Sequence, residues 1–298
     1  MTAPTFRPLG FGEILDGAFT LYRRNFVLFV VTTLVLTAAM GALVVTWGAG
    51  VFATLASGDP SLFLGVMGGL FLLAAGMGVL TLLMWGALVR QATQAYLGQP
   101  TSLADGLRTG MRRLLPLLGA GILAGVGLMV AYFALALVVA AVMGVGALSG
   151  SPGLAVALTF VAAVGAVAAF LFVVALLFAL VPAIVVEDKG AVEGLARSFD
   201  LARGAPGRIV GLMLVTIIIA YLPIIAVLWL TGGFADLANP QAASTGGAFV
   251  TQQLLSWAVG VLTTPFMASV IVLLYFDRRV RTEALDVQMA AERLSPTS

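Results

Sequence analysis

The stretch Phe11–Phe26, FGEILDGAFTLYRRNF, decides how the rest of the chain is interpreted. At helical spacing its apolar side chains gather on one face and its charged side chains on the other. The acidic residues lie in the first turns and Arg23 and Arg24 at the end, as the helix dipole favours. A long apolar run follows directly. An amphipathic helix that ends in arginines before such a run is typical of a helix on a membrane surface. The apolar face comprises Phe11, Ile14, Leu15, Ala18, Phe19, Tyr22 and Phe26.

The composition excludes a soluble globular protein. The 298 residues are 61% hydrophobic and only 9% charged, with a mean hydropathy of +1.12. A soluble chain carries about 25% charged residues, so this one has too few to cover a soluble surface, and we predict an integral membrane protein. The net charge is only +2, and the cations flank apolar runs, so topology explains them better than nucleic-acid binding does.

Six apolar runs exceed the roughly 20 residues that a bilayer core requires. They cover residues 26–55, 62–89, 114–148, 154–186, 209–230 and 249–276. Amphipathic helices precede the first, third and fifth runs. The second amphipathic helix opens with a capping box formed by Ser102 and Asp105, and the third amphipathic helix lies within residues 187–208. We therefore expect an all-α membrane protein with six transmembrane helices and three surface helices. It would form one polytopic domain over residues 1–298, with a tail at residues 277–298.

The distribution of basic residues predicts the topology. All fifteen lie before the first run, after the last, or in the connections after the second and fourth runs. The only charged residues on the opposite side would be Asp59 and Asp236. By the positive-inside rule, both termini are expected in the cytoplasm. No cleavable signal peptide is evident, because the first apolar run is too long for one.

Two segments of the chain match when it is shifted by 89 residues. Asp16-Gly17 then meets Asp105-Gly106, and Arg23-Arg24 meets Arg112-Arg113. A third unit matches only in pattern, through Glu193-Gly194. Either the chain is a threefold repeat of one surface helix and two spans, or helices that enter a membrane from the cytoplasm have converged on terminal arginines.

No constellation of residues indicates an enzyme or a cofactor. The chain has no histidine and no cysteine, which excludes histidine-based catalysis and thiolate metal sites, and it has no nucleotide-binding loop. The densest carboxylates are Glu187, Asp188, Glu193 and Asp200. They could hold a divalent cation, but interleaved Lys189, Arg197 and Arg203 favour an ion-paired face, with Glu193 and Arg197 as an i, i+4 pair. The spans carry hydroxyls but no charge, which indicates helix packing.

Three segments resemble the bacterial glycerophosphoryl diester phosphodiesterase membrane domain family. They read LxxxEILDxAFxLYRRNF from Leu9, PA…E…ARSxxLxxG from Pro182, and YxDxRxRxExxD from Tyr275. The resemblance implies a membrane architecture in a bacterial cytoplasmic membrane. In some members of that family a separate barrel with paired histidines performs the hydrolysis. This chain has no histidine, so the resemblance implies no activity.

The leading hypothesis is a non-enzymatic membrane module that engages anionic lipid or an unidentified protein partner. Basic residues near an anionic surface contribute about 1 kcal/mol each. The alternatives are that the arginines only set topology, or that the protein is a transporter or channel for an apolar or lipid-like solute. The candidate lipid contacts are Arg23, Arg24, Arg112, Arg113, Arg203, Arg208, Arg278 and Arg279.

Overall fold

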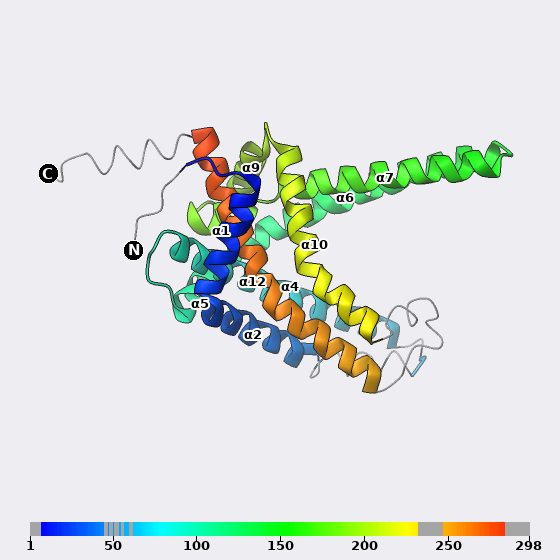
Figure 1. Ribbon diagram of the computed structural model, residues 1–298. Helices are drawn as coiled ribbons and strands as arrows, with labels where there is room; N and C mark the ends of the chain where they lie inside the picture. The colour runs from blue at the N-terminus through cyan, green and yellow to red at the C-terminus, as the bar shows by residue number, and fades with distance from the viewer. Residues whose placement is uncertain are drawn as a thin grey trace. The chain divides into compact units, whose positions relative to one another are not determined.

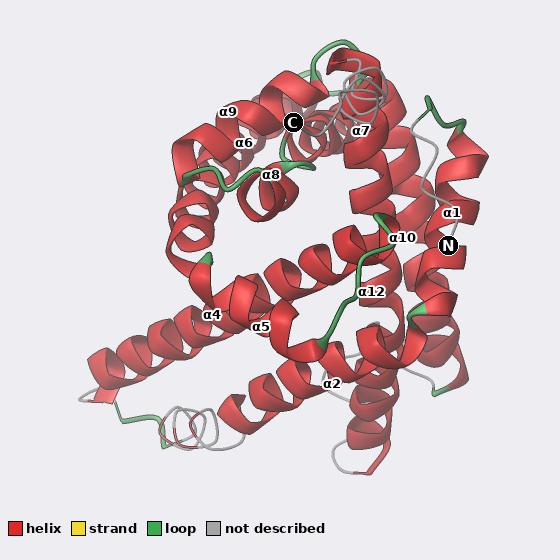
Figure 2. Ribbon diagram, turned by 90° about the vertical axis from the view of Figure 1, so that its left-hand side faces the viewer, coloured by secondary structure: helices red, strands yellow, loops and turns green. Residues whose placement is uncertain are grey.

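The computed structural model describes residues 7–44, 62–231 and 247–283, with single residues and short pieces between 44 and 62. Throughout this described part, all regular structure is helical (Figures 1 and 2). Six helices there are long and apolar enough to cross a membrane, as the sequence predicts. The bounds are α1 Phe11–Arg24, α2 Phe26–Leu43, α4 Phe63–Tyr96, α5 Leu103–Arg112, α6 Leu114–Leu148, α7 Pro152–Leu176, α8 Leu180–Val186, α9 Ala191–Ala202, α10 Pro206–Leu230 and α12 Gly247–Glu283.

The chain divides into two compact units. The first consists of Met1–Leu115 and Val215–Ser298, and the second of Pro116–Leu214. In the first unit α2, α4 and α12 pack against one another, α1 lies along α12, and α5 lies against α4. A buried cluster joins the three long helices: Leu36, Leu83, Met84, Leu88 and Ala268.

The second unit presents an apolar hairpin of α6 and α7, which run side by side in Figure 1. The turn between them is tight: Gly150 has φ +66°, a left-handed conformation that glycine adopts without strain. Large side chains along both helices are exposed, among them Leu137 at 72%, Leu148 at 89% and Phe160 at 68%. Apolar exposure on this scale is untenable in water and fits a lipid environment. The chain is therefore a multi-pass membrane protein.

The second and fourth runs differ most from the sequence-based expectation. We expected the second apolar run to end at residue 89, but α4 continues to Tyr96, because Gln91 and Gln94 are buried and hydrogen-bonded there. The fourth run is interrupted between α7 and α8. Pro182 follows the interruption by a few residues; proline lacks an N–H, and its ring clashes with the carbonyl four residues earlier, here that of Phe178.

Other expectations are confirmed, differ slightly or lie outside the described residues. The last span continues as a helix into the charged tail, as far as Glu283, as expected. The fifth run was expected to begin at residue 209, but α10 begins earlier, at Pro206, a residue favoured at the first helical position. The end of the first run, most of the loop before α12 and the tail beyond Glu283, including Arg293, lie outside the described residues.

Candidate functional site

Helix α1 has an inner apolar edge and an outer one. Ile14, Ala18 and Leu21 are buried where α1 packs along α12, whereas Phe11 and Phe19 are 39% and 53% exposed. The sequence placed these phenylalanines on the same face as Ile14 and Ala18. The structure divides that face, because the contact with α12 is narrower than the apolar stripe. An apolar edge of α1 therefore remains exposed.

The N-terminal end of α1 is held to α12 by a buried carboxylate. Asp277, which is 1% exposed, accepts the backbone N–H of Leu9 over 2.8 Å. Arg281 donates from Nε to both oxygens of Asp277, at 3.0 and 3.1 Å, and from a terminal nitrogen to the carbonyl of Leu9 at 2.7 Å. We call Leu9, Asp277 and Arg281 the α1 clamp. Since it satisfies both backbone groups of Leu9, it fixes where the chain enters α1.

A second clamp holds α5 to the end of α4. Gln94 Nε2 donates to Asp105 Oδ2 at 2.6 Å, and Arg90 Nε lies 3.4 Å from the same oxygen. One turn away, the buried Gln91 donates to Thr32 Oγ1 of α2 at 2.9 Å and to the carbonyl of Ser102 at 3.3 Å. The predicted cap is confirmed, because the Ser102 hydroxyl accepts the N–H of Asp105 at 3.1 Å.

A third clamp, in the second unit, holds α9 to α8. Arg197 Nε lies 2.9 Å from both carboxylate oxygens of Glu187, and Lys189 also pairs with Glu187, at 3.8 Å. Glu193, expected to pair with Arg197, instead accepts the N–H of Gly190 at the start of α9. The predicted ion-paired face is confirmed around Glu187. Within the described residues, no group of three or more acidic side chains is placed to hold a metal ion.

Ser198 fills the interruption before α8. Its hydroxyl accepts the N–H of Ala179 at 3.1 Å and donates to the carbonyl of Leu176 at 2.7 Å. Two backbone groups that the broken helix would leave unsatisfied therefore find a partner.

Each of the three amphipathic helices α1, α5 and α9 packs a glycine directly against a neighbouring helix. A Cβ at Gly17 would lie 2.7 Å from Leu273 of α12, one at Gly106 2.7 Å from Gln91 of α4, and one at Gly194 2.7 Å from Ile184 of α8. These are the three glycines that the sequence comparison aligned. The local packing of α5 on α4 thus has counterparts in α1 on α12 and α9 on α8.

The hydroxyls within the spans serve the helices themselves. Thr32, Thr33 and Thr81 each donate to the carbonyl four residues earlier, at 2.8–2.9 Å. Ser269 does the same with Pro265 at 2.9 Å. These bonds agree with the packing interpretation of the sequence.

The candidate lipid contacts fall into two groups. Arg23, Arg24, Arg112 and Arg203 are exposed, and Arg113 and Arg208 are half-buried; Arg203 also lies 3.5 Å from Asp200. Arg278, by contrast, is only 5% exposed, and Arg279 pairs with Glu283 at 3.0 Å while lying over the Tyr275 ring. The side chains of Arg278 and Arg279 therefore contact the protein rather than its surroundings, because α12 is buried on most sides along residues 272–278.

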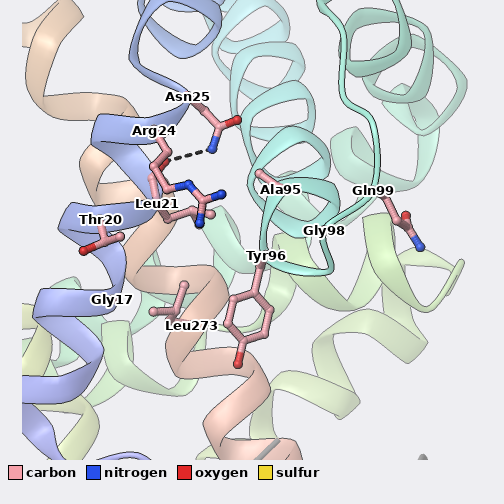
Figure 3. Close-up of a pocket in the computed structure, with 10 residues that line it drawn as sticks. All are labelled: Gly17, Thr20, Leu21, Arg24, Asn25, Ala95, Tyr96, Gly98, Gln99 and Leu273. Atoms are coloured by element: carbon pink, nitrogen blue, oxygen red, sulfur yellow. Dashed lines mark hydrogen bonds between the residues drawn. The ribbon is translucent and has the colours of Figure 1, made fainter. Parts of the chain in front are cut away.

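A pocket of about 380 Å³ opens where α1 ends beside the end of α4. We call it the junction pocket. In Figure 3 the Arg24 guanidinium points across it toward Ala95 and Gly98, while the Tyr96 ring lies beside Leu273. Asn25 is held in place by donating to the carbonyl of Leu21 at 2.9 Å. The residues that line the junction pocket are Gly17, Thr20, Leu21, Arg24, Asn25, Ala95, Tyr96, Gly98, Gln99 and Leu273.

A second, more open hollow of about 570 Å³ begins at the same arginine and follows α2. We call it the junction groove. It is mostly apolar, and Arg24 and Asn25 line both cavities. The groove residues are Arg23, Arg24, Asn25, Phe26, Val27, Leu28, Val31 and Thr101.

Sequence reasoning found Arg23 and Arg24 but missed the residues that position them. The sequence does not single out Asp277 or Gln91 as site residues, and Tyr96 and Gln99 lie beyond residue 89, where the second apolar run is expected to end. The available signal was the position of polar side chains at the last turn of an apolar run, where an unpaired carboxylate or amide would be costly.

Comparison with known proteins identifies the family of the chain. No curated protein matches it, and no solved structure does. A family model described as a domain of unknown function, DUF7847, matches residues 10–277. That range begins one residue before α1 and ends at Asp277 of the α1 clamp. The match shows no link to the glycerophosphoryl diester phosphodiesterase membrane domains. The chain belongs to the DUF7847 family.

Proposed function

We propose that this protein is a non-enzymatic module of the cytoplasmic membrane whose short helices lie at the cytoplasmic surface and engage anionic lipid. The observation that carries the proposal is the end of α1, where two exposed arginines lie directly before an apolar helix and beside exposed Phe19 and Phe26. Cations at headgroup depth beside apolar side chains at acyl depth are what an interfacial helix requires.

The topology supports the same side for all three short helices. Each precedes a long apolar helix, and the cations of the chain cluster at these junctions. Cytoplasmic leaflets carry a negative surface potential, so the positive-inside arrangement also brings these arginines to anionic headgroups.

The burial of individual arginines narrows the set that would contact lipid. Arg23, Arg24 and Arg112 have the exposure that headgroup contact requires. Arg113 and Arg208 are half-buried and Arg203 pairs with Asp200, so these three are secondary contacts. We assign Arg278 to the protein interior and Arg279 to the ion pair with Glu283.

The likeness to the glycerophosphoryl diester phosphodiesterase membrane domains supports an architecture and no activity. Several of the residues that carry it, such as Asp277, Glu187 and Arg197, hold helices together in the clamps. The carboxylates of Asp277 and Glu187 are engaged by backbone and arginine groups. We therefore infer that purified protein with divalent metal ions does not hydrolyse glycerophosphodiesters.

Spin-labelled lipids test the proposal in reconstituted vesicles. Spin resonance gives the relative association of phosphatidylglycerol and phosphatidylcholine with the protein. The double variant Arg23→Gln/Arg24→Gln should lower the preference for phosphatidylglycerol by about 2 kcal/mol at low salt, with a smaller effect as salt screens the surface.

The matched control is Arg7→Gln/Arg108→Gln, which removes the same charge from exposed positions that do not adjoin an apolar helix. It should leave more than half of the preference in place. Equal loss in both double variants would mean that net charge alone acts, and no preference in the native protein would favour a protein partner.

A further inference from the structure

We propose that one anionic phospholipid binds at the α1–α2 junction, with its phosphate beside Arg24, its headgroup in the junction pocket and one acyl chain in the junction groove. This inference rests on the proposed function and deepens it, from a surface that attracts anionic lipid to a built site for a single lipid molecule.

The charge of the site fits a phosphodiester. Arg24 lines both cavities and Arg23 lines the groove, and the described lining residues include no carboxylate. An arginine can offer two parallel N–H donors to a phosphate, which gives geometry as well as energy. The neutral donors Thr20, Asn25 and Tyr96 stand around the same pocket. A positively charged pocket with neutral donors favours a phosphodiester headgroup of net negative charge over a zwitterionic one, whose cation the arginines would repel.

The size and position of the pocket fit a headgroup. Its volume of about 380 Å³ falls within the roughly 300–1,000 Å³ typical of small-molecule sites. It lies at the level where α1 gives way to α2, the first helix apolar enough to span. A headgroup there would occupy the interface rather than the acyl region.

The junction groove can accommodate an acyl chain of the lipid. Its apolar residues Phe26, Val27 and Val31 begin immediately after the arginines and continue along α2. Val27 is 73% exposed and Val31 38% exposed. Arg24 and Asn25 line both cavities, so headgroup and chain sites are continuous. A soluble phosphate compound would fill only the first, and this selects a lipid as the occupant.

Packing and hydrogen bonds around the junction pocket preorganise it as a specific binding site. Gly17, on the pocket wall, packs so closely that a Cβ would lie 2.7 Å from Leu273. The Asn25 side chain is bonded to Leu21, and the Tyr96 ring stacks on Phe276 with centroids 5.1 Å apart. These contacts set the pocket shape before any ligand arrives, which reduces the entropy lost on binding.

Native mass spectrometry of the full-length protein tests the inference, with dioleoylphosphatidylglycerol as the probe. We expect one lipid to bind saturably, and dioleoylphosphatidylcholine to bind less tightly. Arg24→Gln should weaken binding of that one lipid about fivefold, the effect of one basic residue. Arg112→Gln removes the same charge from an exposed position at the end of α5 and should change this binding less than twofold.

Two uncharged substitutions separate the site from general attraction. Ala95→Leu fills the pocket and Val31→Phe, at an exposed position, fills the groove. Each should abolish the saturable lipid while the phosphatidylglycerol preference in vesicles persists. If both leave the bound lipid unchanged, or if Arg24→Gln and Arg112→Gln weaken it equally, the site does not exist although the proposed function stands.

A soluble probe tests whether the acyl chain of the lipid is needed for binding. Glycerol phosphate should compete with the lipid only at concentrations at least about tenfold above that of the lipid, since it lacks the groove contacts. Competition at equal concentration would overturn the groove assignment. A native protein that shows no lipid-charge preference in vesicles would overturn the proposed function as well, and the two failures are therefore distinguishable.

Discussion

The carboxylate of Asp277 accepts the backbone N–H of Leu9 over 2.8 Å, although the two residues are 268 positions apart in the chain. Arg281 neutralises this buried carboxylate and binds the carbonyl of Leu9 as well. The first short helix and the last long helix are thus joined by charge-assisted hydrogen bonds of the stronger kind.

Removing the clamp carboxylate should destabilise the protein. Asp277→Ala leaves the Leu9 N–H without its acceptor and Arg281 without its carboxylate; Arg281 is partly exposed and keeps the Leu9 carbonyl, so we expect a cost of about 1–3 kcal/mol, mostly from the unsatisfied N–H. We expect a clear fall in Tm in detergent, with release of the N-terminal segment to protease. Glu283→Gln is the control, since Glu283 is more exposed and pairs with Arg279 on the same helix. An equal fall in both variants would contradict the clamp.

Close packing of α5 on α4 predicts the effect of a single methyl group. A Cβ at Gly110 would lie 2.8 Å from Leu83 Cδ1 and 3.0 Å from the Leu83 carbonyl. Because backbone atoms cannot give way easily, Gly110→Ala should cost about 1–3 kcal/mol. Gly12→Ala meets nothing within 4 Å and should be neutral or stabilising, as alanine favours helix. Thermal unfolding of both variants compares them, and a stable Gly110→Ala protein would show that the helices are farther apart.

Acid should loosen the start of α1. Glu13 hydrogen-bonds to Arg7 and to the N–H of Gly10, and these bonds hold its pKa below the usual carboxyl value. A lowered pKa in the folded state means that the stabilisation is present above the unfolded pKa, about 4.3, and is lost as the pH falls through the folded value. Amide hydrogen exchange in α1, corrected for its intrinsic pH dependence, should therefore quicken below about pH 4.3. Glu13→Gln should abolish that transition, and a transition that persists in Glu13→Gln would assign it to another group.

Cysteine labelling tests the proposed topology on a background without cysteines. Ser57→Cys, in the short connection between the first two spans, should react with a membrane-impermeant thiol reagent in intact cells. Ser295→Cys should react only after the cells are opened. Labelling of Ser295→Cys from outside would reverse the orientation, and would place the junction arginines on the leaflet without the negative potential.

The helices could be predicted from sequence because length and periodicity are local properties. The run at residues 114–148 coincides with α6, and Ser102 caps α5 as its spacing from Asp105 indicates. The clamps could not be predicted, because a buried Asp277 depends on a partner from the other end of the chain. Nor could the end of α4, where Gln91 and Gln94 read as polar linker until their partners on α2 and α5 are known. The junction arginines were predictable, whereas the cavities around them were not.

The α1 clamp also dictates an order of events during synthesis. Leu9 leaves the ribosome long before Asp277 exists, and at about 5–20 residues per second the delay is on the order of tens of seconds. For that time Ile14 and Ala18, which are fully buried in the finished protein, have no α12 to cover them. The nascent N-terminal helix must therefore wait against lipid or a chaperone, and folding of the first unit can be completed only when the last helix has been inserted.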